Sequence, residues 1–319
     1  MNSLVLASLS LPNLVSRLPG GVAQGIIWGI MALGVYITFR LLDVADLTVD
    51  GSFTTGGAVT VMLIIAGWPA WAALLAAVVA GLLAGLVTGL LHTKLGIPAI
   101  LAGILTQFAL YSINLRIMSM KANTPVNPDK YSLFLTLRSV PGAIWKGLLL
   151  AAVLIALLYW YFGTEQGSAI RATGANPAMS RAQGININAM KVLGLSLSNG
   201  MVALSGGLMA QYQGFADINM GRGAIVIGLA AVIIGEVMFG KVFRNIGARL
   251  LAVSIGAIVY YIVLQIVLQI GLSTNDLKLI TALIVALFLT LFLTLSYLNL
   301  KKTRRKPRRA AKEGVEQHA

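Results

Sequence analysis

The chain has 319 residues, of which 58% are hydrophobic and 11% charged, and its formal net charge is +14. A soluble domain has roughly a quarter of charged residues, so this composition excludes an ordinary soluble protein and predicts an integral membrane protein. The chain has no cysteine, and its two histidines, His92 and His318, are far apart, which excludes disulfides, thiolate catalysis and a histidine cluster for a metal.

The N-terminal segment, residues 1–19, is weakly apolar and broken by Pro12, so we expect it to lie at the membrane interface. It has neither the basic start nor the cleavage site of a signal peptide. Residues 20–299 are expected to form one transmembrane domain, followed by a basic cytoplasmic tail at residues 300–319. Eight of the 24 basic residues lie in KKTRRKPRRAAK, Lys301 to Lys312, beside an apolar segment, as is typical of a cytoplasmic anchor at anionic lipid.

Apolar segments of roughly 15–22 residues predict an all-α polytopic protein with about nine transmembrane helices. The expected spans are residues 21–42, 53–66, 70–91, 97–117, 147–162, 192–212, 224–239, 250–270 and 280–298. Within the third span, Gly81, Gly85 and Gly89 are spaced four apart, so we expect another helix backbone to approach there.

Five of the amide side chains within the apolar spans are candidates for a solute route. They either line a route for solute or form interhelical hydrogen bonds of about 1 kcal/mol, and packing is the more frequent role for each taken singly. These residues are Gln107, Asn114, Asn199, Gln265 and Gln269.

A cytoplasmic tail determines the sidedness of every loop by parity. The loops at residues 92–94, 163–190 and 241–249 are then cytoplasmic, and the N-terminus and the long loop at residues 118–146 are external. The remaining lysines and arginines divide equally between the two sides, so the tail alone determines this orientation.

Two charged interruptions resemble each other. ADLTVDG, Ala45 to Gly51, is similar to ADINMG, Ala216 to Gly221, and five predicted spans separate them. An odd number of spans would make the two copies face opposite sides of the membrane, as in transporters built from inverted repeats with broken helices. The match is short, and coincidence is an equally good explanation of it alone.

The polar stretch from Gly163 to Met190 carries the signals of a short capped helix. Asn176 stands at an N-cap position, Pro177 at the first helical position, and Gly184 at a left-handed stop. A capped helix of about two turns between two spans is suited to contact something outside the membrane, although a solvated loop that happens to be helical is the commoner explanation.

No motif predicts catalysis or a cofactor bound by the chain itself. Gly235 to Lys241 has the G-x-x-x-x-G-K spacing of a phosphate-binding loop, but it ends an apolar span and has Val242 where the magnesium-binding hydroxyl would stand. Glu236 is an ionisable group in or near the bilayer, which suggests function, yet snorkelling or pairing with Lys241 or a free backbone N–H is the simpler interpretation. Asp43, Asp46, Asp50 and Asp217 lie mostly at span boundaries.

Three stretches resemble the permease subunit of bacterial ABC importers, in the branched-chain amino-acid and ribose-type permease family. They are DLTVDGSF from Asp46 to Phe53, RATGANPAMSRAQGIN from Arg171 to Asn186, and AAVIIGEVMFG from Ala230 to Gly240. The first is the most specific and is similar to the tryptophan/tyrosine-type subgroup. Together with the span layout, the resemblance covers about residues 20 to 300. It departs from the family at the N-terminus, because family members often have an additional span before the nine counted here.

The resemblance implies a permease that dimerises around a central pathway in the inner membrane, with ATP and magnesium on a separate ATPase subunit and solute delivered by an external binding protein. A cytoplasmic coupling helix would dock on the ATPase, with Met179 as an adaptable apolar contact and Arg181 facing an acidic rim. The residues assigned to coupling are Gly174, Asn176, Pro177, Met179, Ser180, Arg181 and Gly184. The residues assigned to the translocation pathway are Asp46, Asp50, Gln107, Asn199, Asp217 and Glu236.

The sequence therefore favours the permease subunit of a homodimeric, ATP-driven importer for amino acids or similar small organic solutes. An ion-coupled secondary transporter is the alternative, and it would require a carboxylate cluster or unwound helices at the middle of the membrane. A membrane-embedded enzyme would require a convergent catalytic set, and none is evident in the sequence.

Overall fold

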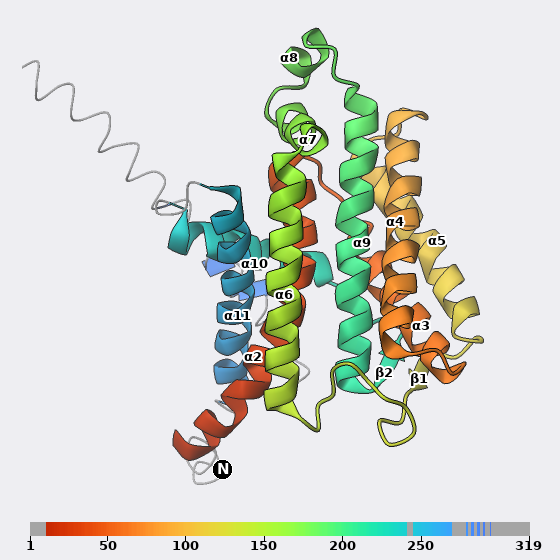
Figure 1. Ribbon diagram of the computed structural model, residues 1–319, viewed down its shortest axis with the longest axis vertical. Helices are drawn as coiled ribbons and strands as arrows, with labels where there is room; N and C mark the ends of the chain where they lie inside the picture. Colours follow the sequence, from red (N-terminus) through yellow and green to blue (C-terminus); the bar gives the residue numbers. More distant parts are fainter. Residues whose placement is uncertain are drawn as a thin grey trace, which may run out of the picture.

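The computed structural model describes residues 11–240 and 245–269, together with the single positions 279, 282, 283, 286, 287, 290 and 294. Within these residues the chain is a bundle of long helices with a small two-stranded sheet at one end and two short helices at the other (Figure 1). The elements are α2 (Leu11–Tyr36), η1 (Ile37–Leu41), α3 (Val49–Ile65), α4 (Ala70–Thr93), α5 (Ala99–Ile117), β1 (Asn123–Pro125), α6 (Val140–Gly163), α7 (Glu165–Ala175), α8 (Pro177–Ala182), α9 (Ile187–Gln213), β2 (Phe215–Asp217), α10 (Ala224–Phe239) and α11 (Ile246–Gln269).

Two helices form the centre of the bundle. α2 packs against α9, α11, α10 and α6, and α9 packs against α4, α3 and α2. The most apolar windows of α2 and α9 are 83% and 78% buried, whereas those of α4, α5, α6 and α11 are only 22% to 39% buried. The outer helices therefore present apolar side chains outward, as expected of helices that face lipid or another membrane subunit.

The number of membrane spans differs from the predicted nine. Among the residues that the structure describes, six helices are long and apolar enough to cross a membrane, while α3 and α10 are apolar but shorter. Eight of the nine predicted segments are thus helical, and the count of nine is not confirmed. The ninth segment, residues 280–298, lies outside the described residues except for single positions, and the basic tail lies wholly outside them.

Helix boundaries differ most from the predicted ones at two places. α2 begins at Leu11 and runs through Pro19, so there is no break between the expected interfacial segment and the first span. Pro12 lies in the first described turn of this helix. α6 begins at Val140, within the predicted external loop, and Pro141 likewise occupies its first turn.

The predicted all-α class omits one small sheet. β1 and β2 pair antiparallel, with Asn123 opposite Asp217 and Pro125 opposite Phe215. Each strand has only three residues, which is too short for a period of two to be visible in the sequence.

The glycine stripe on α4 brings two helix backbones together, as predicted. A Cβ atom at Gly81 or Gly85 would overlap the carbonyl oxygen of Asn199 or Leu195 on α9, and one at Gly89 would lie 2.8 Å from the Cα of Val192. Because lipid is as apolar as these side chains, burial of apolar surface alone does not hold the two helices together. The close approach stabilises their contact through van der Waals packing.

Buried polar side chains connect α3, α4, α5 and α9. The Thr88 hydroxyl lies 2.8 Å from the Thr48 hydroxyl and donates to Thr106 Oγ1 at 2.9 Å. Ser52 Oγ donates to Asn199 Oδ1 at 2.6 Å, and Asn199 Nδ2 donates to Asp46 Oδ2 at 2.7 Å. Each of these groups is paired away from water, and together they hold the start of α3 against its neighbours.

The two similar charged segments approach each other inside the bundle. The first follows η1, whose Leu41 contacts Gly174 at the α7 end, and the second begins in β2 at the other end (Figure 1). A Cβ atom on Gly221 would overlap the carbonyl oxygen of Asp50, and the Gly221 N–H donates to Thr54 Oγ1 at 3.2 Å, so the two segments meet. The two segments enter from opposite ends of the bundle, and each leads into one of the shorter helices, α3 or α10 (Figure 1).

Candidate functional site

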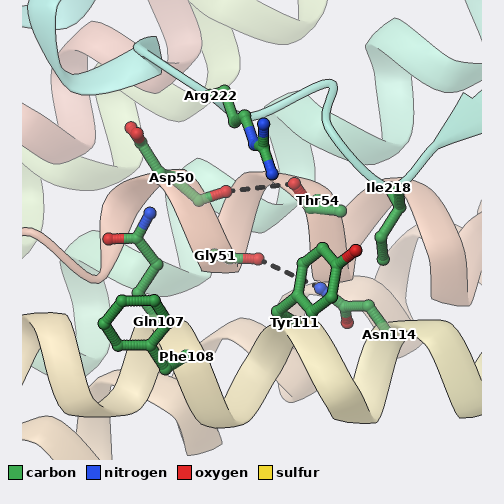
Figure 2. A pocket seen from close by; sticks show the side chains of 9 residues that line it. All are labelled: Asp50, Gly51, Thr54, Gln107, Phe108, Tyr111, Asn114, Ile218 and Arg222. Atoms are coloured by element: carbon green, nitrogen blue, oxygen red, sulfur yellow. Dashed lines mark hydrogen bonds between the residues drawn. The ribbon is translucent and has the colours of Figure 1, made fainter.

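A pocket of about 330 Å³ opens where the two charged segments meet, between α3, α5 and the loop before α10. Its wall contains polar, aromatic and charged side chains from these three elements (Figure 2). The lining residues are Asp50, Gly51, Thr54, Gln107, Phe108, Tyr111, Asn114, Ile218 and Arg222. Two of the residues predicted for the pathway, Asp50 and Gln107, are thus brought together.

Asp50 joins α3 to α10. Its Oδ2 accepts the N–H of Gly223 at 2.9 Å and its Oδ1 accepts the N–H of Ile225 at 3.0 Å. The first N–H groups of a helix have no partner within the helix, and Gly223 at the N-cap has no side chain to supply one. Asp50 therefore caps α10 from another helix, and its negative charge stands at the positive end of the α10 dipole.

The α5 side of the pocket is a single helix face. It is formed by Gln107 and by the residues one, four and seven positions after it, which are Phe108, Tyr111 and Asn114. This spacing makes their side chains point to the same side. Phe108 is 71% exposed and Tyr111 is 44% exposed. Asn114 is buried, donates a long hydrogen bond of 3.5 Å to the Gly51 carbonyl, and has an Oδ1 atom without a partner in the described part of the chain.

Arg222 supplies the positive charge of the pocket. It lies in the loop between β2 and α10, is exposed, and points toward Thr54 and Tyr111 (Figure 2). Its guanidinium makes no hydrogen bond or ion pair within the residues that the structure describes. With Asp50, it gives the wall one negative and one positive side chain.

Sequence reasoning did not identify Phe108, Tyr111 or Arg222 as site residues. The helical spacing of Phe108 and Tyr111 relative to Gln107 and Asn114 is a usable signal on α5. Arg222 carries no comparable signal, because its place in the pocket depends on Asp50, which is 172 positions earlier.

The other predicted pathway residues lie away from this pocket. Asp46 and Asn199 are buried in the polar contacts of α3 and α9, which agrees with the packing role that we favoured for Asn199. Asp217 lies in β2, where its Oδ1 accepts the Asn219 N–H at 2.7 Å.

Glu236 forms an ion pair that the sequence did not predict. Its Oε1 lies 2.7 Å from Nε of Arg40 in η1, so the pair joins the end of α2 to α10. Lys241, the partner considered from the sequence, lies outside the described residues.

The predicted capped helix is present as α8. Asn176 Oδ1 accepts the Met179 N–H at 3.0 Å, and Gly184 has a φ of +79° at the stop after the helix. Met179 is 62% exposed and Arg181 is exposed, whereas Ser180 is buried and donates its hydroxyl to the Asn176 carbonyl at 3.0 Å. Of the residues assigned to docking, Met179 and Arg181 therefore offer free side chains, and Ser180 supports the helix from inside.

A second helix, α7, precedes α8 and was not predicted. Thr164 caps it by accepting the Gly167 N–H at 3.4 Å, and Gly167, Ile170 and Thr173 form its buried face. Gly174 rests directly on η1, where a Cβ atom would overlap the Leu41 carbonyl oxygen. In Figure 1, α8 lies beyond the ends of the long helices, whereas α7 lies beside α9 and contacts η1, the turn before the chain that leads to Asp50.

Residues 18–294 match the sequence profile of a family described as "Branched-chain amino acid transport system / permease component". A protein of Clostridioides difficile (strain R20291) named "Tyrosine transport system permease protein" is 42% identical over 220 residues, which cover 69% of this chain and 73% of that protein. An uncharacterised protein of Rickettsia prowazekii (strain Madrid E) is 36% identical over 243 residues, which cover 75% of this chain and 84% of the relative. No solved structure matches the chain with significance.

Proposed function

Because the chain belongs to the branched-chain amino acid transport permease family, a family of multi-pass membrane subunits of ABC importers, we propose that α8 docks on a separate ATPase subunit and that the pocket between α3, α5 and α10 lies on the solute pathway. The chain itself is the permease component and not the catalytic one. The partner ATPase binds ATP and magnesium, and an external binding protein delivers the solute.

The observation that carries this proposal is the contact between α7 and η1. α8 presents Met179 and Arg181 outward, and the helix before it rests on Leu41 through Gly174. The same η1 segment holds Glu236 through Arg40 and leads into the stretch that contains Asp50. A displacement of α8 by an ATPase subunit would therefore be transmitted through packed backbone to both the pocket and α10.

The arrangement of the complex follows from this docking. α8 faces the cytoplasm, so β1, β2 and the loop between β1 and α6 face the outside, where a binding protein would approach. Residues 20–299 form the permease domain and residues 300–319 a cytoplasmic tail at the lipid surface. Two copies form the pathway as a homodimer in the inner membrane. The tyrosine named for the relative at 42% identity makes an aromatic amino acid the solute that we propose to test first.

The test is co-purification of the permease with its ATPase subunit from membranes. We expect the ATPase to be retained by the wild type and lost from the double variant Met179→Asp, Arg181→Glu, since an acidic α8 would neither pack against an apolar groove nor pair with an acidic rim. Thermal unfolding of the variant should stay unchanged, because both side chains are exposed.

A matched control lies at the opposite end of the bundle. Met120 and Arg116 are also an exposed methionine and an exposed arginine, and Met120→Asp with Arg116→Glu makes the same change of charge there. This control should keep the ATPase. Equal loss from both double variants, or solute uptake driven by a sodium or proton gradient without any ATPase, would refute the proposed docking and favour the ion-coupled alternative.

A further inference from the structure

We propose that the pocket between α3, α5 and α10 is a binding site for a zwitterionic aromatic amino acid, with Arg222 pairing with its carboxylate and Phe108 and Tyr111 packing on its ring. This inference rests on the proposed function for its choice of solute, but its site and its test are independent of the ATPase. The proposed contact is a transient one between the solute and the permease. It is separate from the selection of the solute by the binding protein.

The charges of the pocket favour a zwitterion. Asp50 has both oxygens engaged by backbone N–H groups of α10, so its carboxyl group is held in place where it lines the pocket. Arg222 has no partner in the described residues and points into the pocket (Figure 2). The planar guanidinium is suited to bidentate pairing with a carboxylate, and the ammonium group of the same solute then balances Asp50.

The α5 face of the pocket favours a ring. Phe108 and Tyr111 are one helical turn apart, are both exposed, and lie on the same side of α5. Aromatic rings in such a wall bind another ring in offset or edge-to-face arrangements, which adds about 0.5–1.5 kcal/mol beyond area burial. A volume of about 330 Å³ is at the small end of ligand pockets, which suits one amino acid.

The shape of the site depends on the meeting of the two charged segments. Asp50 holds Gly223 and Ile225, and Thr54 holds Gly221, so three backbone hydrogen bonds fix the loop that carries Arg222. Arg222 is therefore presented at a defined place relative to α5, as recognition of a carboxylate requires.

The absence of cysteine from the chain allows a direct test by site-specific labelling. Gln107 lines the pocket, is partly exposed and is not assigned a contact with the solute, so Gln107→Cys serves as the reporter. Leu105→Cys, 45% exposed on the same helix and outside the pocket, is the control. The full-length permease is reconstituted in lipid nanodiscs, and the rate of maleimide labelling is measured with and without L-tyrosine.

We expect L-tyrosine to slow labelling of the Gln107→Cys variant several-fold and to leave the Leu105→Cys variant unchanged. Tyramine, which has the same ring and ammonium group but no carboxylate, should not protect. Adding Arg222→Gln should weaken protection by about tenfold to a hundredfold in tyrosine concentration, as is usual for loss of a charge-assisted hydrogen bond. Arg116→Gln, which removes an exposed arginine at the end of α5, should leave protection intact.

Three results would overturn the inference: no protection by L-tyrosine, equal protection by tyramine, or full protection in the Arg222→Gln background. Uptake by the complete importer, measured in parallel, separates this inference from the proposed function. Uptake of tyrosine without protection would refute the site and retain the importer, whereas protection without ATP-driven uptake would retain the site and refute the importer.

Discussion

At the scale of single residues, Asp50 has the greatest influence on the site, because one side chain connects three parts of the fold. It belongs to the first turn of α3, caps α10 through two backbone N–H groups, and lines the pocket. Removing its carboxylate leaves two N–H groups at the start of α10 without partners.

We expect Asp50→Ala to lower the free energy of unfolding by about 1–3 kcal/mol for each N–H group left unsatisfied, and Asp50→Asn, which keeps one acceptor oxygen, to have a smaller effect. Thermal unfolding in detergent, followed by the loss of monodisperse protein, measures the difference. Asp129→Ala is the control, since this aspartate and its partner Arg138 are exposed on a loop and such pairs contribute little. A ranking in which Asp129→Ala is the more harmful change would show that the cap is not important.

Single residues also show where sequence reasoning succeeds and where it stops. Asn176 and Gly184 could be assigned because a helix cap is a local pattern of a few residues. Arg222 could not, because its role comes from contacts between segments that are far apart in sequence. The partner of Glu236 was missed for the same reason, since Arg40 lies 196 positions away.

At the scale of elements, the α4–α9 contact and the α7–η1 contact each depend on glycine, but they differ in how much of each could be predicted from the sequence. On α4 the stripe could be predicted, because a repeat of small residues every four positions marks one helix face. The partner helix could not, since many helices can approach such a face. α7 was missed because EQGSAIRATGA has two glycines and a low apolar content, and its buried face consists of only three residues.

We expect Gly85→Val to separate α4 from α9 and to abolish recovery of folded permease, because the new side chain would overlap the Leu195 carbonyl. Size-exclusion profiles of fluorescent fusions measure this directly. Leu86→Val places a β-branched residue at the adjacent, exposed position and should elute as the wild type does. Normal elution of the Gly85→Val variant would show that the two helices are free to move apart.

The α7–η1 contact gives a prediction about transport. Gly174→Ala should leave the ATPase bound and lower solute uptake, because the added methyl group displaces Leu41 without changing the exposed surface of α8. Co-purification and uptake in proteoliposomes are measured on the same preparation. Gly163→Ala is the matched change, since a Cβ atom there meets nothing within 4 Å. Unimpaired uptake by the Gly174→Ala variant would exclude this contact as the route of coupling.

At the scale of the whole molecule, the bundle has two unlike ends, one with α7 and α8 and the other with the small sheet (Figure 1). Hydropathy in the sequence was sufficient to find eight helical segments, because bilayer burial leaves long apolar runs. It could not show that two of them are shorter helices that begin within the bundle, and the span count therefore differs. Hydropathy also could not show that the two charged segments meet, since this depends on the packing of α3 and α10.

The unlike ends predict opposite accessibility in the native membrane. In the absence of native cysteines, Met120→Cys should react with an impermeant maleimide in intact spheroplasts, and Met179→Cys only after permeabilisation. Both methionines are well exposed, so a difference in labelling reports sidedness and not burial. Labelling of the Met179→Cys variant from outside would invert the orientation and exclude docking of α8 on a cytoplasmic ATPase.

The π-helical winding of η1 has a mechanical consequence for the molecule. Leu42 donates its N–H to the Ile37 carbonyl at 3.0 Å, five residues back, so this turn holds one residue more than an α-helical turn. If the turn tightened to α-helical winding, everything after it would rotate by roughly 100°, the angle of one helical residue. This rotation would separate Arg40 from Glu236, and α7 contacts the same turn. A change of winding in η1 would thus convert a small displacement of α7 into a large rotation of the residues that follow η1.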